Sequence, residues 1–131
     1  MAFCFDLDGT ITTQSGFGAS EKSIPWWIIW LVLLIYKPKI NVPFLRLIQE
    51  IKKKETVLIF TARPERTKLI TIKYLEKNNV PFDKIFFLGN GKKSAERKIK
   101  KAKEEGVKVL YDNNKKVVEM AKKEGIASFL I

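Results

Sequence analysis

Two hydrophobic patterns alternate along most of the chain. Short apolar runs rich in β-branched and aromatic residues, bounded by polar or turn residues, predict buried strands. Longer segments with apolar residues three or four positions apart predict amphipathic helices. Because strands alternate with helices, we predict right-handed crossovers and a doubly wound parallel α/β sheet covered on both faces. The strands are expected at residues 2–5, 56–60, 84–88, 107–111 and 126–131, and the helices at 24–36, from 41 onward, 64–78, 94–105 and 115–124.

The spacing of hydrophobic residues also predicts which side of two helices packs against the sheet. The expected faces are Phe44, Leu47, Ile48 and Ile51 in the helix that begins near residue 41, and Leu69, Ile72 and Leu75 in the helix at 64–78. Residues 12–23 are mostly polar and contain two glycines, so we predict a loop there, with Ser23 as the cap of the next helix.

The segment at residues 24–36 departs from the amphipathic pattern, because it is apolar on every side and contains all three tryptophans. As a helix it would be about 20 Å long, shorter than the roughly 30 Å hydrocarbon core of a bilayer, so a spanning helix is not expected. Three roles remain open: a packed lid, a homodimer interface, and contact with a membrane surface, of which the first two are preferred. We predict one domain over residues 1–131, with this helix as an insertion that forms a minimal cap or none.

Polar side chains gather where three of the predicted strands end. Asp6 and Asp8 follow the first strand, Thr61 and Arg63 follow the second, and Asp112 follows the fourth. Ligands of open parallel sheets bind beyond this edge. Two carboxylates placed two residues apart on extended backbone point the same way, and a cation is needed to keep both ionised. Mg²⁺ prefers such oxygen ligands, and a carboxylate can also attack phosphorus to form an acyl phosphate.

The charge and the reactive residue types narrow the function further. The chain has 25 Lys and Arg against 14 Asp and Glu, a formal charge of +11, which favours anionic partners such as phosphates, nucleic acid or an acidic membrane. Most of the lysines are attributed to solvated helix surface of the kind found in heat-adapted (thermophile) proteins. With one cysteine and no histidine, an internal disulfide, a histidine base and a His/Cys zinc site are excluded. We therefore expect a cytoplasmic protein.

At this point the chain resembles the haloacid dehalogenase-like (HAD) hydrolase superfamily. Phe5-Asp6-Leu7-Asp8-Gly9-Thr10 resembles its first motif, Ile59-Phe60-Thr61-Ala62-Arg63 its second, and Leu110-Tyr111-Asp112-Asn113 its fourth. The third motif is a lysine before the fourth strand, which we assign to Lys93 by spacing, with Lys92 as the alternative.

The resemblance implies a Mg²⁺-dependent phosphatase that works through an aspartyl phosphate. Asp6 would be the nucleophile and a metal ligand, and Asp8 would transfer the protons and bind the metal through its backbone carbonyl. Asp112 would complete the metal site. The substrate contacts would come from Thr61, Ala62, Arg63 and Lys93. For Arg63, a grip on the substrate and a grip on a neighbouring carboxylate remain equally open.

The second and fourth motifs, with Lys116-Val117-Val118-Glu119-Met120, are most similar to the 3′-phosphatase domain of polynucleotide kinases. That resemblance implies a phosphorylated nucleic-acid end as substrate, with a phosphorylated small molecule as the alternative. One departure is that Asn113 and Asn114 stand where many relatives carry a second acid. Two other functions therefore stay open: a non-catalytic phosphate-binding or regulatory domain, and a membrane-associated protein that uses the apolar helix.

Overall fold

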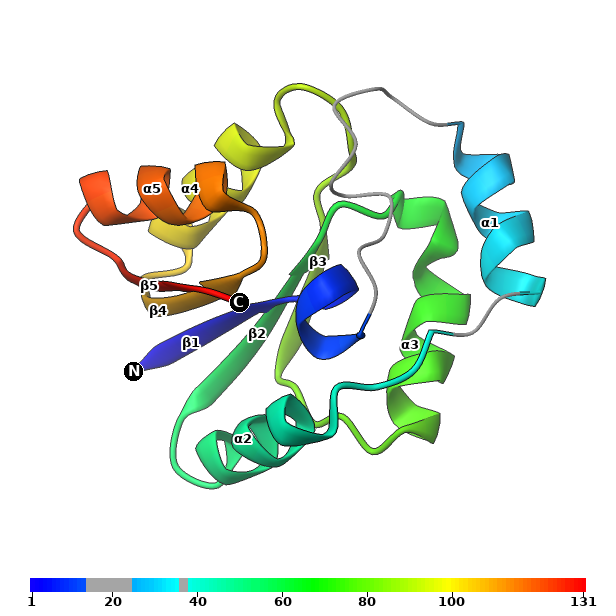
Figure 1. The fold of residues 1–131 in the computed structure, drawn as a ribbon, viewed down its shortest axis with the longest axis horizontal. Coiled ribbons are helices and arrows are strands. Elements are labelled where there is room, and N and C mark those ends of the chain that lie inside the picture. The colour runs from blue at the N-terminus through cyan, green and yellow to red at the C-terminus, as the bar shows by residue number, and fades with distance from the viewer. Residues whose placement is uncertain (14–24, 36–37) are drawn as a thin grey trace.

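The sheet is five-stranded and entirely parallel, in the order β3-β2-β1-β4-β5, with helices on both faces (Figure 1). A computed structural model describes residues 1–13, 25–35 and 38–131. This arrangement confirms the predicted doubly wound α/β fold. The strands are β1 (Ala2–Asp6), β2 (Thr56–Thr61), β3 (Lys84–Phe87), β4 (Val107–Asp112) and β5 (Ala127–Leu130), and the α-helices are α1 (Trp26–Ile35), α2 (Val42–Lys52), α3 (Lys68–Lys77), α4 (Ser94–Glu104) and α5 (Lys115–Lys123).

The strand order reverses at β1, which lies between β2 and β4. Asp6 pairs with Phe60 of β2, and Phe5 pairs with Tyr111 of β4, so the three strands end at nearly the same level. Parallel strands that share a register deliver the residues after them to one edge. The ends of β1, β2 and β4 therefore form the switch point at which the predicted site residues are expected to meet.

Side chains alternate between two cores, one on each face of the sheet. In β2, Leu58 and Phe60 join the core under α4 and α5, whereas Val57 and Ile59 join the core under α2 and α3. This period of two explains why the strand is a continuous apolar run: it is buried on both sides. Thr61 therefore stands at the end of a strand that is buried on both faces.

Two of the predicted helix faces are partly wrong. Leu69 is 82% exposed, and the buried residues of α3 are Thr71 and Leu75. A short 3₁₀ turn, η3 (Glu65–Thr67), precedes α3 and delays its first turn, so the face that meets the sheet is shifted along the sequence. In α2, Leu47 is exposed, and Leu45 packs against the core in its place.

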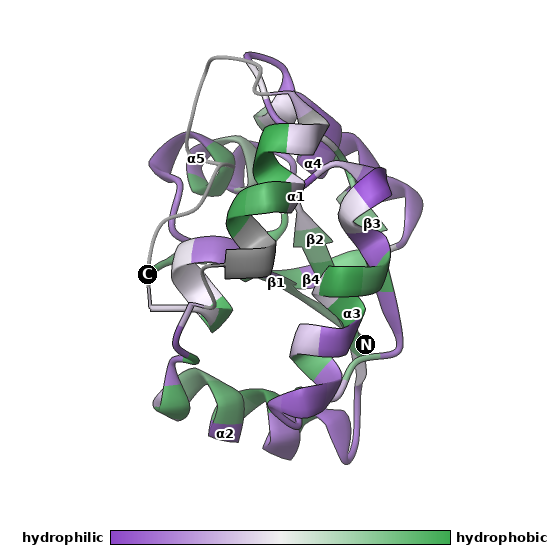
Figure 2. Ribbon diagram, turned by 90° about the vertical axis from the view of Figure 1, so that its right-hand side faces the viewer, coloured by the Kyte–Doolittle hydropathy of each residue, from purple (hydrophilic) through white to green (hydrophobic). Residues whose placement is uncertain are grey.

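Helix α1 lies on the side of the molecule toward which the strands point, and it packs against η3 and α3 (Figures 1 and 2). Ile29 is fully buried, whereas Trp27, Trp30 and Leu31 are exposed. No helix in the described ranges is both long and apolar enough to cross a membrane. The predicted cap residue Ser23, and most of the predicted loop at 12–23, lie outside the described residues.

Candidate active site

Two carboxylates and one ammonium group meet at the switch point. Lys98 Nζ lies 2.7 Å from Asp6 Oδ1 and 2.8 Å from Asp112 Oδ2. Asp6 ends β1, Asp112 ends β4, and Lys98 reaches them from α4. All three side chains are buried, so their charges interact with little screening by water. The structure therefore brings together the predicted nucleophile and the predicted metal-binding carboxylate, with a lysine between them.

The lysine at this position is Lys98, whereas the sequence interpretation chose Lys93. Lys93 occupies the N-cap position of α4 and is exposed. Its alternative Lys92, one residue earlier, is exposed as well. Asp6 is buried and its lysine partner is Lys98, so neither exposed lysine fills the predicted place. The missed signal is the spacing within α4, where Lys98 shares the buried face with Ala95, Ile99 and Ala102. A lysine on an otherwise apolar face indicates a buried partner.

Burial and charge shift the acidity of this cluster in a consistent direction. Burial raises the pKa of Asp6 from 3.8 to about 7; Lys98 opposes that rise, and Asp112 adds to it. Burial opposes the charge of Lys98, but Asp6 and Asp112 outweigh it and raise the pKa of this lysine. Lys98 thus stays charged, and the ionised form of Asp6 depends on the cations around it.

The oxygen atoms beside Lys98 suit a hard cation. The Asn113 amide lies 3.0 Å from Asp6 Oδ2 and 3.3 Å from Asp112 Oδ1, and its nitrogen donates to both when turned toward them. Turned the other way, its oxygen would face two carboxylate oxygens, an arrangement that a cation between them would have to stabilise. The donor set therefore fits Mg²⁺, with Asp6 and Asp112 as anionic ligands.

The Asp8 carboxylate pairs with Arg63 and does not join Asp6 and Asp112 as a third carboxylate ligand of a metal. It accepts from Arg63 Nε at 2.9 Å and from Arg63 Nη2 at 2.6 Å. Arg63 therefore grips a neighbouring carboxylate, which decides between the two interpretations for this structure. Within the described residues, no three His, Cys, Asp or Glu side chains are grouped to hold a metal ion. The role predicted for Asp8 in metal binding was that of its backbone carbonyl, which this pairing leaves unaffected.

A tight turn after β1 sets the directions of Asp6 and Asp8. The turn η1 (Leu7–Ile11) contains Gly9 at a φ of 84°, a conformation that side-chain-bearing residues rarely adopt. The turn brings the Thr10 hydroxyl to 3.5 Å from Asp6 Oδ2, a long contact. Asp6 and Asp8 thus diverge, with one directed at Lys98 and the other at Arg63.

Thr61 ends β2, and Ala62 follows it at the same edge of the sheet. Both are buried, and the Thr61 hydroxyl oxygen accepts from the backbone N–H of Arg63 at 3.1 Å. A hydroxyl that accepts one hydrogen bond keeps its own proton for donation. Thr61 therefore keeps a proton to donate near the end of β1, and its contact with a phosphoryl oxygen stays a prediction.

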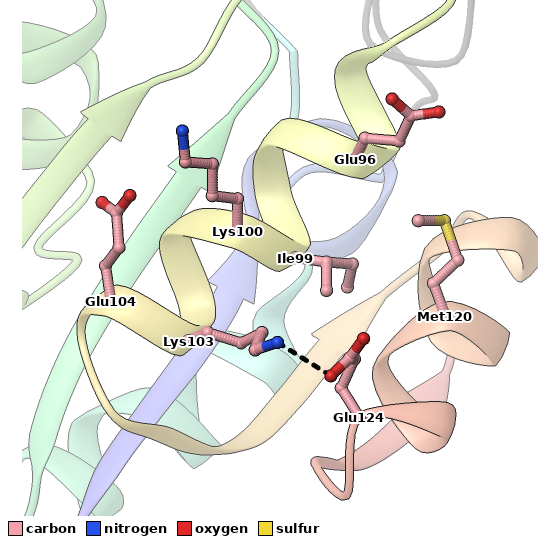
Figure 3. Close-up of a pocket in the computed structure, with 7 residues that line it drawn as sticks. All are labelled: Glu96, Ile99, Lys100, Lys103, Glu104, Met120 and Glu124. Carbon is pink, nitrogen blue, oxygen red and sulfur yellow. Dashed lines mark ion pairs between the residues drawn. The ribbon is translucent and has the colours of Figure 1, made fainter.

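A separate groove of about 370 Å³ lies on the outer side of α4 and α5 (Figure 3). Ile99 and Met120 line it together with charged side chains, and Lys103 bridges to Glu124 at 3.0 Å across it. None of the predicted site residues lines this groove. The chemistry-bearing residues thus lie at the strand ends and not in this groove.

Comparison with solved structures finds the same fold in an RNA repair assembly. A chain of the Pnkp1/Rnl/Hen1 RNA repair complex superimposes with a TM-score of 0.75 at 20% identity, over 99% of this chain and 42% of that one. A second structure of the Pnkp1/Rnl/Hen1 complex gives 0.75 at 18% identity, over 99% and 45%. No family model and no curated protein matches the sequence. The fold is shared. This chain spans less than half the length of those chains.

Proposed function

We propose that the protein is a Mg²⁺-dependent phosphomonoesterase of the HAD type, in which Asp6 is the nucleophile. The observation that carries the proposal is the meeting of Asp6, Lys98 and Asp112 at the switch point, with Asp8 and Thr61 on the same edge. A buried carboxylate beside a buried cation can be held ionised and aimed at phosphorus, which is what nucleophilic catalysis by aspartate requires.

The proposed reaction has two chemical steps. In the first, an Asp6 oxygen bonds to phosphorus while the bond to the leaving oxygen breaks, and Asp8 donates a proton to that oxygen. In the second, a water oxygen bonds to phosphorus while the bond from phosphorus to the Asp6 oxygen breaks; Asp8 takes the water's proton, inorganic phosphate leaves and the Asp6 carboxylate is regenerated. Lys98 and the Thr61 proton stabilise the phosphoryl oxygens. Mg²⁺ bound by Asp6, Asp112 and the Asp8 carbonyl would neutralise charge on the phosphoryl group.

The proposed substrate is a phosphorylated nucleic-acid end, with small phosphate esters as the alternative. Three observations support it: the fold shared with chains of an RNA repair complex, the formal charge of +11, and the resemblance of the Thr61 and Asp112 segments to polynucleotide 3′-phosphatases. A basic surface favours polyanions over single phosphates, because each neutralised phosphate adds to the affinity.

Hydrolysis of p-nitrophenyl phosphate, with and without Mg²⁺, tests the activity. We expect turnover that needs the metal and is lost in Asp6→Asn. An inactive wild type, or an active Asp6→Asn variant, would defeat the proposal. A screen of 3′-phosphorylated oligonucleotides, 5′-phosphorylated oligonucleotides, nucleotides and sugar phosphates then tests the substrate class. A preference for sugar phosphates would favour the small-molecule alternative.

A non-catalytic phosphate-binding domain is the second candidate, and Asn113 favours it. This amide adjoins Asp6 and Asp112 but adds no negative charge to the site. Fewer anionic ligands weaken the binding of Mg²⁺. For such a domain, phosphate would raise the melting temperature of the wild type while p-nitrophenyl phosphate is not hydrolysed at any Mg²⁺ concentration.

A further inference from the structure

Arg63 is an entirely buried cation whose hydrogen bonds join three parts of the fold. Its side chain is 2% exposed. It donates twice to Asp8, which lies in the turn after β1, and once, from Nη1, to the Thr71 hydroxyl of α3 at 3.2 Å. A buried guanidinium must be neutralised and its donors satisfied, so these partners fix both its position and the orientation of its plane.

Thr71 is unusual for its place in the structure. It lies in α3, whose other buried residue is Leu75, and its side chain is fully buried. An apolar residue would fill this position if packing were its only role. A threonine that faces a buried arginine instead supplies an acceptor. The polar character of Thr71 is a second reason, besides the 3₁₀ turn before α3, that the buried face of this helix was predicted wrongly from the sequence.

The guanidinium group of Arg63 links the position of Thr71 to the orientation of the Asp8 carboxylate. Because the group is planar, the bond at Nη1 restricts rotation of the plane that also contains Nε and Nη2. These two nitrogens hold both oxygens of Asp8, so the plane of the carboxylate follows the plane of the guanidinium. Each carboxylate oxygen keeps a further lone-pair direction for a proton.

We infer that Thr71 is a positioning residue for the proton transfer carried out by Asp8. The inference rests on the proposed phosphatase function. In the first step the bond from phosphorus to the leaving oxygen breaks, the bond from Asp6 to phosphorus forms, and the Asp8 proton moves to the leaving oxygen. Thr71 touches none of these atoms, and acts by holding Arg63 so that the Asp8 oxygen points along the path of the proton.

The leaving group separates this role from a merely structural one. Nitrophenolate leaves without a proton, whereas an alkoxide needs one, so in the first step a misaligned Asp8 slows only the reaction of alkyl phosphates. The second step, in which Asp8 takes the water's proton, is common to both substrates and does not enter kcat/KM, which reports the steps up to release of the leaving group. We expect Thr71→Val to lower kcat/KM for an alkyl phosphate by roughly 10-fold, and kcat/KM for p-nitrophenyl phosphate by less than about 2-fold, because general acid catalysis contributes at least 10²-fold in full.

Three further variants guard against loss of fold. Thr71→Ser keeps the hydroxyl and should restore kcat/KM for the alkyl phosphate. Arg63→Lys keeps the charge but loses the pair of parallel hydrogen bonds to Asp8. It should show the same loss of activity toward the alkyl phosphate alone as Thr71→Val. Ser128→Ala removes another buried hydroxyl, one that donates to the Val118 carbonyl, and should leave both rates unchanged. Melting temperatures of all four variants accompany the kinetics.

The outcomes are distinct. Equal losses on both substrates, or no loss on either, in Thr71→Val and Arg63→Lys would overturn the inference while the phosphatase function stands. A wild type that hydrolyses neither substrate would overturn the phosphatase function, and the inference with it.

Discussion

Lys98 holds two buried carboxylates together, and the three charges depend on one another. Its ammonium group bonds Asp6 and Asp112 at 2.7 and 2.8 Å, with all three side chains buried. A buried ion pair gains little over apolar packing, but removing one partner leaves an uncompensated charge and is costly. The arrangement is therefore better explained by chemistry than by stability, since an apolar core would be as stable without it.

Replacing Lys98 should reveal this dependence. In Lys98→Met, Asp6 and Asp112 face each other without a cation, and we expect the free energy of unfolding at neutral pH to fall by about 3 kcal/mol. Activity toward p-nitrophenyl phosphate should be lost. Urea unfolding and turnover measure the two effects, with Lys93→Met as the matched control because Lys93 is exposed. A Lys93 variant that loses activity while Lys98→Met keeps it would restore the original assignment.

Asp6 should make stability depend on pH in a direction opposite to that of an ordinary paired acid. Burial raises its pKa to about 7, with Lys98 opposing and Asp112 adding to the rise, whereas the unfolded chain keeps the ordinary 3.8. Between these values the folded protein holds a proton that the unfolded chain has lost. The stabilising contribution is full below the unfolded pKa and is lost as pH rises through the folded one.

The variant Asp6→Asn cannot lose this proton. Its stability relative to wild type should therefore rise from about pH 4 to about pH 7, by a few kcal/mol, and level off above. Urea unfolding of both proteins with EDTA present measures the difference. Asp83→Asn is the control, because a hydrogen bond from the Val57 amide, with Lys52 beside it, lowers the pKa of Asp83, and any change from it lies in more acidic solution. A flat difference between wild type and Asp6→Asn would contradict the raised pKa.

At the scale of elements, the strands were predictable and the helix faces were less so. Strand ends follow from local sequence: Asp6, Thr61 and Asp112 each end an apolar run, and parallel pairing then brings them to one edge. A helix face depends on where the first turn begins, which the 3₁₀ turn before α3 changes. Lys98 and Thr71 were missed for a further reason: they are polar residues on buried faces, and only the distant Asp6 and Arg63 explain them.

Helix α1 packs against α3 and η3, and Ile29 is its buried side chain among those that the structure describes. Ile29 is fully buried, while Trp27, Trp30 and Leu31 are exposed on the same helix. Ile29→Ala should lower the free energy of unfolding by about 2 kcal/mol or more through lost contacts and a cavity. Urea unfolding measures this loss, with Leu31→Ala as the control because Leu31 is exposed. Equal effects of the two changes would contradict the packing of α1 through Ile29.

The exposed face of α1 also tests the open roles of this helix. We expect light scattering to show a dimer that Trp30→Glu dissociates, because an exposed apolar patch gains stability when a second copy covers it. A monomer that co-sediments with anionic vesicles would instead favour the membrane role.

Over the whole molecule, exposed lysines lie at both edges of the sheet, and some of them beside the site. At the edge where strands begin, acids partner lysines: Glu50 with Lys53 at 2.8 Å, and Glu124 with Lys103 at 3.0 Å. At the opposite edge, the exposed Lys92, Lys93 and Lys116 adjoin the first turns of α4 and α5 near Asp112. Exposed ion pairs stabilise little, whereas exposed lysines beside the site can attract a polyanionic substrate.

Salt should therefore distinguish a polyanionic substrate from a small one. Each nucleic-acid phosphate that the basic edge neutralises releases counterions, with an affinity slope of about −0.7 per phosphate for a single strand. We expect kcat/KM for a 3′-phosphorylated oligonucleotide to fall steeply with added salt, and that for p-nitrophenyl phosphate to change little. Replacing Lys92, Lys93 and Lys116 together with Gln should flatten the first dependence and leave the second alone, whereas the same change at Lys53, Lys103 and Lys122 should alter neither. Equal salt dependence for both substrates would mean that the positive edge binds no polynucleotide backbone, and would favour a small phosphate ester.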